Sequence, residues 1–246
     1  MTRSLTTWTA LFAMLLCLGC PGSKTGASGK TSAAKSGADA KTAAPATPTA
    51  RGKTHDNRTW ALYEPADKPA GKRPVLVAFH PGANWRLMIQ RWGPVADKLG
   101  WFVLASKTSK NGMDMAAIAR GFGMGVDAMG AKHPLDLDRL ATTGFSGGGM
   151  LSHYLAMAMK ARVRAVIPNT GIVHPTFRAK KNYPVGKIVA FIASPTDRRY
   201  AEMKGDRKRL EDLKWRVKWI EFKGGHILAP YETCLEAATW VEETWR

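Results

Sequence analysis

Five consecutive residues, Gly144-Phe145-Ser146-Gly147-Gly148, place a serine in the pattern G-x-S-x-G. An apolar run before them and a helical pattern after them predict a strand and a helix, which is the context this motif requires. Flanking glycines permit a tight, strained turn, so the Ser146 hydroxyl would protrude and the Gly147 N–H would point toward a developing oxyanion. A glycine-rich loop with a passive serine is the alternative interpretation. The motif favours a nucleophile at Ser146.

An aspartate and a histidine follow this serine in the chain order of a catalytic triad, each just after a predicted strand. His226 would act as the general base on Ser146, and Asp197 would orient the imidazole. Glu202 and Asp206 are the nearby acidic alternatives. Both lie in a basic helical stretch, where local salt bridges explain them. The predicted triad is therefore Ser146, His226 and Asp197.

The loop 80–84, which reads His-Pro-Gly-Ala-Asn, follows another predicted strand and is suited to an oxyanion hole. Its proline, Pro81, has no N–H to donate. The donor from this loop would be Gly82 or Ala83, and Gly147 would supply the other. Trp85 would either line the acyl pocket or pack into the core.

Apolar runs and helical patterns alternate from residue 58 onward, which predicts an α/β fold with a mainly parallel central sheet and helices on both faces. The strands are predicted at 59–63, 75–79, 101–105, 140–143, 163–167, 188–192 and 217–221. The helices are predicted at 87–99, 113–131, 150–161, 200–213 and 230–244. Such sheets bind ligands beyond the carboxyl ends of their strands, so functional residues should lie there.

The remaining histidines and the last cysteine receive structural interpretations. His133, His153 and His174 lack the placement of His226 and are expected to be core or solvent-exposed residues. Cys234 lies in an apolar helical pattern, which indicates a buried and inert thiol. None of these residues is expected to bind a metal.

The amino terminus has the features of an export signal. Arg3 precedes an apolar run that is too short to span a bilayer and ends at Cys17-Leu-Gly-Cys20. This ending resembles a bacterial lipobox, although Cys17 stands where leucine is usual. The resemblance implies a lipoprotein signal peptide at 1–19 and a lipidated Cys20. An ordinary cleaved signal peptide is the alternative.

The stretch after the lipobox consists mainly of Gly, Ala, Ser, Thr, Lys and Pro and has no large apolar residue to bury. Such a segment cannot offset its ordering entropy, so we expect a disordered tether at 20–54 followed by a catalytic domain at 55–246. Together these features predict an exported, membrane-anchored lipoprotein of the bacterial cell envelope.

The net charge of the chain is +18, and residues 55–246 keep 30 Lys and Arg against 18 Asp and Glu. Basic clusters at 178–181 and 198–209 are not interleaved with stacking aromatics as in a nucleic-acid module. We therefore expect no nucleic-acid partner. A solvated charged face is the simplest interpretation, and attraction to an anionic polymer of the envelope also fits the charge.

Residues 72–242 resemble the α/β-hydrolase superfamily, and within it exported esterases related to polyhydroxybutyrate depolymerases and feruloyl esterases. The segment 133–146, which leads into the serine, and Gly224-Gly225-His226 carry this resemblance. It implies an acyl-enzyme mechanism at Ser146 with no metal or organic cofactor. The chain departs from the pattern at Pro81, where many relatives have glycine, and it lacks the cysteines that staple many secreted depolymerases.

The short basic segment 171–186 stands where many lipases insert a helical cap, so we expect no sizeable cap domain and an open site. An open site with a basic rim favours small or polymer-linked esters over long-chain lipids. Two alternatives remain: a peptidase or thioesterase using the same triad, or a non-catalytic lipoprotein that binds wall polymer on a hydrolase scaffold.

Overall fold

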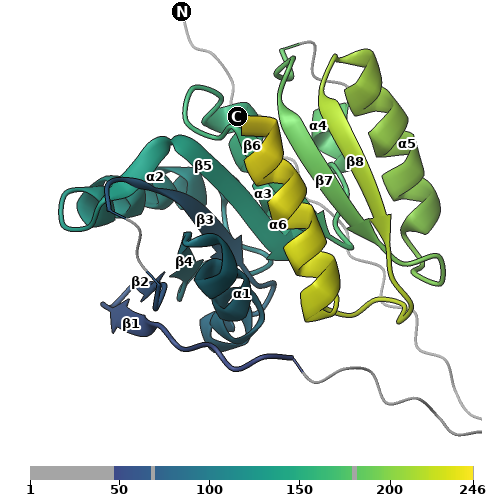
Figure 1. The fold of residues 1–246 in the computed structure, drawn as a ribbon. Helices are drawn as coiled ribbons and strands as arrows, with labels where there is room; N and C mark the ends of the chain where they lie inside the picture. The colour runs from purple at the N-terminus through teal and green to yellow at the C-terminus, as the bar shows by residue number, and fades with distance from the viewer. Residues whose placement is uncertain (1–46, 68–69, 179–181, 246) are drawn as a thin grey trace, which may run out of the picture. The chain divides into compact units, whose positions relative to one another are not determined.

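An eight-stranded sheet runs through the middle of the fold in the order β1-β2-β4-β3-β5-β6-β7-β8 (Figure 1). The two pairings β1 with β2 and β2 with β4 are antiparallel, and all other neighbours are parallel. The computed structural model describes residues 47–67, 70–178 and 182–245. The mainly parallel sheet expected from the sequence is thus present.

The strands are β1 Lys53–Asp56, β2 Trp60–Glu64, β3 Arg73–Phe79, β4 Phe102–Ser106, β5 Leu135–Phe145, β6 Ala165–Asn169, β7 Ile188–Ala193 and β8 Arg216–Glu221. Seven of them correspond to the predicted apolar runs. The strand β1 was not predicted, because its sequence Lys-Thr-His-Asp is polar and mostly exposed.

Successive side chains of a strand point to opposite faces of the sheet, and the central strands are apolar on both. In β3, Val75, Val77 and Phe79 enter one core cluster. Leu76 and Ala78 of the same strand enter the other. The sheet is therefore buried between two hydrophobic layers, which fixes the strand ends that carry functional loops.

The helices are α1 Trp85–Leu99, α2 Met115–Gly130, α3 Gly147–Ala158, α4 Pro175–Arg178, α5 Tyr200–Asp212 and α6 Tyr231–Trp245. Helices α1 and α6 pack together on one face of the sheet, and α2, α3 and α5 contribute to the core on the other (Figure 1). The helix after Ser146 begins three residues earlier than predicted, because Gly147, Gly148 and Gly149 are helical despite their low propensity.

Residues just before β1 are fastened to the folded unit. The Arg51 backbone N–H donates to Asp97 Oδ2 at 2.7 Å, and the Gly52 N–H donates to the Tyr63 hydroxyl at 2.5 Å. Arg51 and Gly52, upstream of residue 55, thus contact the folded unit. The expected signal at 1–19 and the lipidated Cys20 lie outside the described residues.

The connection between β6 and β7 contains only the four-residue helix α4 among its described residues, which agrees with the expectation of no sizeable cap.

Across residues 47–67, 70–178 and 182–245, no helix combines the length and apolar character that crossing a bilayer requires. Cys234 is fully buried in α6, as predicted, and burial raises the pKa of its thiol to about 12, which disfavours the reactive thiolate.

Candidate active site

Ser146 lies in a sharp turn between the end of β5 and the start of α3. Its backbone has φ 53° and ψ −114°, a conformation that side-chain-bearing residues rarely adopt. The turn is held by a hydrogen bond from the Ser146 N–H to the Asn169 carbonyl on the neighbouring strand, at 2.9 Å. Strain of this kind persists only where the surrounding structure imposes it, and it is concentrated at functional sites.

The glycines around Ser146 are required by close packing of backbone segments. A Cβ on Gly144 would collide with the backbone of Gly148, and a Cβ on Gly148 would collide with the carbonyl of Phe79 at the end of β3. The G-x-S-x-G spacing therefore lets the first turn of α3 sit against both β5 and β3. It brings Ser146 to the carboxyl edge of the sheet, where the loops meet.

Two hydrogen bonds join the predicted catalytic side chains. Ser146 Oγ lies 2.8 Å from His226 Nε2, and His226 Nδ1 lies 2.7 Å from Asp197 Oδ2. The Asp197 side chain is fully buried, whereas the His226 side chain keeps 25% of its exposure. A buried carboxylate beside Nδ1 favours the tautomer in which Nδ1–H donates to Asp197 and Nε2 accepts from the Ser146 hydroxyl.

The loops that carry Asp197 and His226 are tied to each other. The second carboxylate oxygen of Asp197 accepts the Arg199 N–H at 2.8 Å, which fixes the carboxylate orientation. The Gly225 N–H donates to Ser194 Oγ at 2.9 Å, and Gly225 has φ +71°, a region that glycine enters without steric cost. These contacts hold the imidazole over the serine.

The two acidic alternatives to Asp197 have other partners. Asp206 is buried, accepts the Val173 N–H at 2.8 Å and forms a bidentate pair with Arg178 at 2.8 and 3.0 Å. Burial raises the pKa of Asp206 above its ordinary value. Glu202 lies 3.3 Å from Arg199. Glu202 thus forms the kind of local ion pair that its sequence context indicated, whereas Asp206 pairs with Arg178 of α4, outside its own helix.

The expected oxyanion loop leaves its backbone donors partly engaged. The Ala83 N–H donates to the His80 carbonyl at 3.0 Å, and Ala83 has φ +57°. The Gly82 N–H donates to His80 Nδ1, also at 3.0 Å. Burial lowers the pKa of His80, which favours the neutral ring that accepts this bond. The Ala83 N–H is therefore used within a backbone turn. The Gly82 N–H is bonded to the His80 side chain, which can rotate away and release it.

A second loop, between β4 and α2, braces the first. Gly82 forms an isolated antiparallel bridge with Lys110, and the Asn111 N–H donates to the Pro81 carbonyl at 2.8 Å. The Asn111 amide lies against Gly147, because a Cβ added to Gly147 would overlap it. Asn111 thus connects the two segments from which oxyanion donors were expected. Nothing in the local sequence around Asn111 indicated this.

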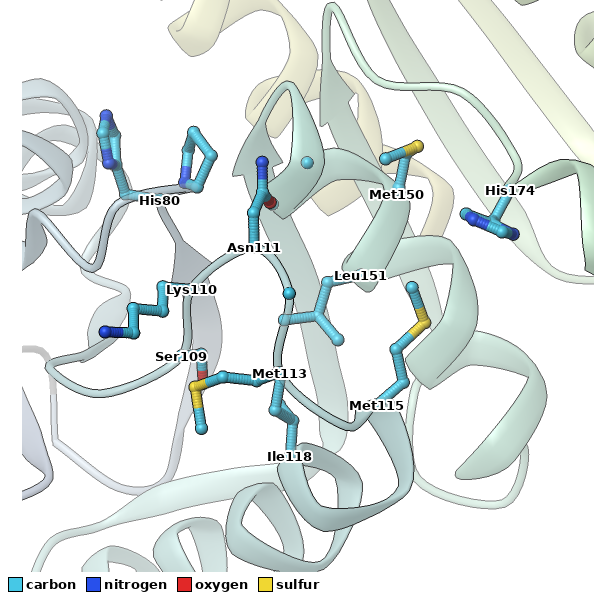
Figure 2. Close-up of a pocket in the computed structure, with 14 residues that line it drawn as sticks. His80, Ser109, Lys110, Asn111, Met113, Met115, Ile118, Met150, Leu151 and His174 are labelled. Carbon is cyan, nitrogen blue, oxygen red and sulfur yellow. The ribbon is translucent and has the colours of Figure 1, made fainter. Parts of the chain in front are cut away.

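A cavity of about 390 Å³ borders Gly147, directly after the serine. Its volume falls within the usual range for small-molecule sites. Figure 2 shows Lys110, Asn111 and Met113 on the loop after β4, and Met150 and Leu151 on α3. The lining residues are His80, Pro81, Ser109, Lys110, Asn111, Gly112, Met113, Met115, Ile118, Gly147, Gly148, Met150, Leu151 and His174.

Trp85, for which the sequence left two roles open, packs against the core cluster of α1 and α6 and does not line this cavity. The cavity wall comes instead from methionines and aliphatic residues of α2, α3 and the preceding loop. Methionine spacing in these helices is equally typical of core packing, so it did not predict a pocket.

No family model matches the chain, and no curated protein matches its sequence. Solved structures do resemble it. An arylesterase structure has a TM-score of 0.64 at 12% identity, covering 83% of this chain and 89% of that chain. An esterase of Rhizomucor miehei has a TM-score of 0.62 at 15% identity, covering 82% and 84%.

A third structure, an acylaminoacyl peptidase of Pyrococcus horikoshii, has a TM-score of 0.55 at 19% identity, and the match covers 80% of this chain but 40% of that chain. At such identities the likeness concerns the fold. The chain has the α/β-hydrolase fold, with Ser146, His226 and Asp197 hydrogen-bonded at the carboxyl edge of its sheet.

Proposed function

We propose that this chain is a serine hydrolase that cleaves carboxylic esters through an acyl-enzyme at Ser146. The observation that carries the proposal is the continuous hydrogen-bond path from Ser146 Oγ through His226 to the buried Asp197. A nucleophile, its base and an orienting carboxylate in this geometry form the minimal apparatus for acyl transfer. The solved esterases of the same fold support the ester as substrate class.

In the proposed reaction, Ser146 Oγ attacks the ester carbonyl carbon while its proton passes to His226 Nε2. The tetrahedral intermediate collapses, the C–O bond to the alcohol breaks, and His226 returns the proton to the leaving oxygen. Water then attacks the acyl-enzyme with His226 again as base, releasing the acid and restoring the serine. Asp197 stabilises the imidazolium in both steps and retains its negative charge.

The Gly147 N–H is the proposed first oxyanion donor, since it directly follows the nucleophile at the start of α3. For the second donor, Ala83 is disfavoured by its bond to the His80 carbonyl. We infer that Asn111 Nδ2 donates together with Gly82 once the His80 ring releases the Gly82 N–H. The amide atom nearest to the Cβ position of Gly147 is Asn111 Oδ1, so the amide group rotates to present Nδ2.

The cavity supports a substrate with a compact acyl or aryl group. Three methionines and two aliphatic side chains give it an apolar part, and five side chains add polar groups: His80, Ser109, Lys110, Asn111 and His174. A volume of about 390 Å³ suits a small or medium-sized group better than an extended lipid chain. We therefore retain the preference for small or polymer-linked esters over long-chain lipids.

The test is covalent labelling of the purified protein with a fluorophosphonate probe. Wild type should be labelled, Ser146→Ala should not, and His226→Ala and Asp197→Ala should react much more slowly. Ser152→Ala is the matched control, because Ser152 lies on the same helix but is fully buried and donates to the Gly148 carbonyl. Unlabelled but folded wild type would contradict the proposal and favour a binding role.

Peptidase or thioesterase activity is the alternative function for the same three side chains. The likeness of the fold to an acylaminoacyl peptidase favours this alternative. An ester, a thioester and an anilide with one shared acyl group would separate these activities by kcat/KM. Fastest turnover of the ester supports the proposal, whereas fastest turnover of the anilide or thioester replaces it.

We also propose that the chain acts outside the cytoplasm, held to a membrane through Cys20. The sequence of residues 1–20 carries this proposal. The basic balance of residues 55–246 would draw the domain toward an anionic envelope polymer. Binding of a Ser146→Ala variant to such a polymer, with salt releasing it, would test the attraction separately from catalysis.

A further inference from the structure

Two histidines and a glutamate from distant parts of the chain meet on one side of the sheet. They are His55 on β1, Glu64 at the end of β2 and His133 in the turn before β5. Each is half-buried, and each offers one ligand atom within 4.8 Å of the others. His55 Nε2 lies 2.8 Å from Glu64 Oε2, and the two imidazole centroids are 5.0 Å apart.

The strand register explains how this cluster forms. His55 pairs with Leu62 across the antiparallel β1–β2 ladder, so Glu64, two residues further along β2, points to the same face. Leu62 belongs to the core cluster under α2, and the same face carries Phe102, whose ring centroid lies 6.4 Å from that of His133. The three polar side chains therefore lie beside the apolar surface that Leu62 and Phe102 form on this face of the sheet.

We propose that His55, Glu64 and His133 form a binding site for a divalent transition metal, with Zn²⁺ as the ion that best suits the ligands. Two imidazole nitrogens and one carboxylate oxygen are a ligand set that zinc accepts, with water in the fourth position. Zinc–ligand bonds of about 2.0–2.1 Å place tetrahedral ligand atoms about 3.3 Å apart, so closing a 4.8 Å cluster around the ion requires only small side-chain movements.

The site would act on stability, because it lies far from the proposed catalytic atoms along the sheet. His133 lies two residues before the first residue of β5, whereas Ser146 follows the other end of that strand. An ion shared by β1, β2 and this turn would fasten the edge strand to the centre of the sheet. A ligand that binds only the folded state stabilises it by mass action.

The experiment uses the full chain, purified without a polyhistidine tag and dialysed against a chelator. Titration with zinc sulphate should show one ion per chain, and His55→Ala, Glu64→Gln and His133→Ala should each weaken binding at least about 10-fold. Zinc at about 100 times Kd should raise the wild-type Tm by roughly 5–10 °C. The three variants should lose most of that increase.

Two control variants remove similar groups elsewhere. Asp138→Asn removes an exposed acid near the turn, and His174→Ala removes a histidine in the connection after β6; both should keep wild-type zinc affinity. Far-UV circular dichroism without metal identifies any variant that fails to fold, and the remaining two variants then decide. Wild type that binds no zinc, or a folded His133→Ala that binds as tightly as wild type, would overturn the proposal. Fluorophosphonate labelling is expected to be the same with and without zinc, which keeps this test independent of catalysis.

Discussion

His226 Nδ1 lies 2.7 Å from Asp197 Oδ2, on a carboxylate that is completely withdrawn from solvent. An exposed carboxylate would attract the imidazolium weakly, because water screens the charge. The buried one is fixed in place by the Arg199 N–H and can both select the tautomer and stabilise the charge that forms during reaction. The relationship between these two residues determines how the serine is activated.

Asp197→Asn should therefore lower kcat by about 10⁴-fold with little change in KM, because the amide favours the tautomer that cannot accept the serine proton. Steady-state hydrolysis of an aryl acetate at neutral pH measures this. Asp212→Asn, on the exposed end of α5, should match wild type. A loss of less than tenfold in Asp197→Asn would show that another group orients His226.

Asn111→Ala should lower kcat by about 10²-fold, within the range seen when an oxyanion donor is removed, while KM changes little. The reason is the position of the Asn111 amide between the Pro81 loop and Gly147. Thr108→Ala, in the same loop, is the matched control, since Thr108 is exposed and does not line the cavity beside Gly147. An unchanged kcat in Asn111→Ala would assign the second donor to Gly82 alone.

Met113→Trp should shift the acyl preference toward shorter groups, because Met113 is 40% exposed at the cavity and a larger ring would occupy part of it. We expect the ratio of kcat/KM for hexanoate over acetate to fall about 10-fold or more. Met124→Trp is the control, since Met124 is exposed on α2 and does not line this cavity. Equal ratios in the two variants would place acyl binding elsewhere.

His153 makes stability depend on pH. Its ring is buried in α3 without a hydrogen-bond partner among the described residues, and burial lowers its pKa to about 3. The unfolded chain binds the proton near pH 6.5, so the contribution of neutral His153 is complete above that pH and is lost as pH falls toward 3. Between pH 7 and pH 5, proton uptake by this group in the unfolded chain lowers the free energy of unfolding by about 1–2 kcal/mol.

Urea unfolding at pH 7 and pH 5 measures this dependence. His153→Phe should lose less stability over that interval than wild type, because the substituted ring takes up no proton. His174→Phe, which removes a partly exposed histidine, should retain most of the wild-type slope. Parallel losses in wild type and His153→Phe would assign the acid sensitivity to other groups.

Cys20→Ser should release the protein from the membrane fraction of cells that produce it, because the proposed thioether anchor needs that sulphur. Two or more acyl chains bind a bilayer firmly where one does not. Cys17→Leu, which introduces the usual lipobox residue, should stay with the membrane. Membrane retention of Cys20→Ser would contradict lipidation at this position.

The buried part of the fold was predictable because central parallel strands read as continuous apolar runs. Strand β7, Ile188–Ala193, is buried throughout and was predicted to within one residue. The edge strand β1 carries only polar residues and derives its order from pairing with β2, which its local sequence does not reveal. The four-residue α4 is too short for any periodic pattern.

The relation between Ser146, Asp197 and His226 was predictable because each follows a strand of one parallel sheet, whose carboxyl ends converge. The cavity was not predictable. Asn111 reaches Gly147 only through the bridge between two loops, and that contact depends on side-chain packing. His133 was interpreted as a core or solvent-exposed histidine, because His55 and Glu64, its neighbours in space, are far from it in the chain.

The described chain joins the sheet through β1, whose only sheet partner is β2. Lys53, the first residue of this strand, lies at the end of the sheet opposite Ser146. If an upstream anchor holds the protein, any mechanical load reaches the bonds of Arg51 and Gly52 and then the cross-strand hydrogen bonds of β1. Tension on the domain is thereby kept away from the turn that holds the reacting serine.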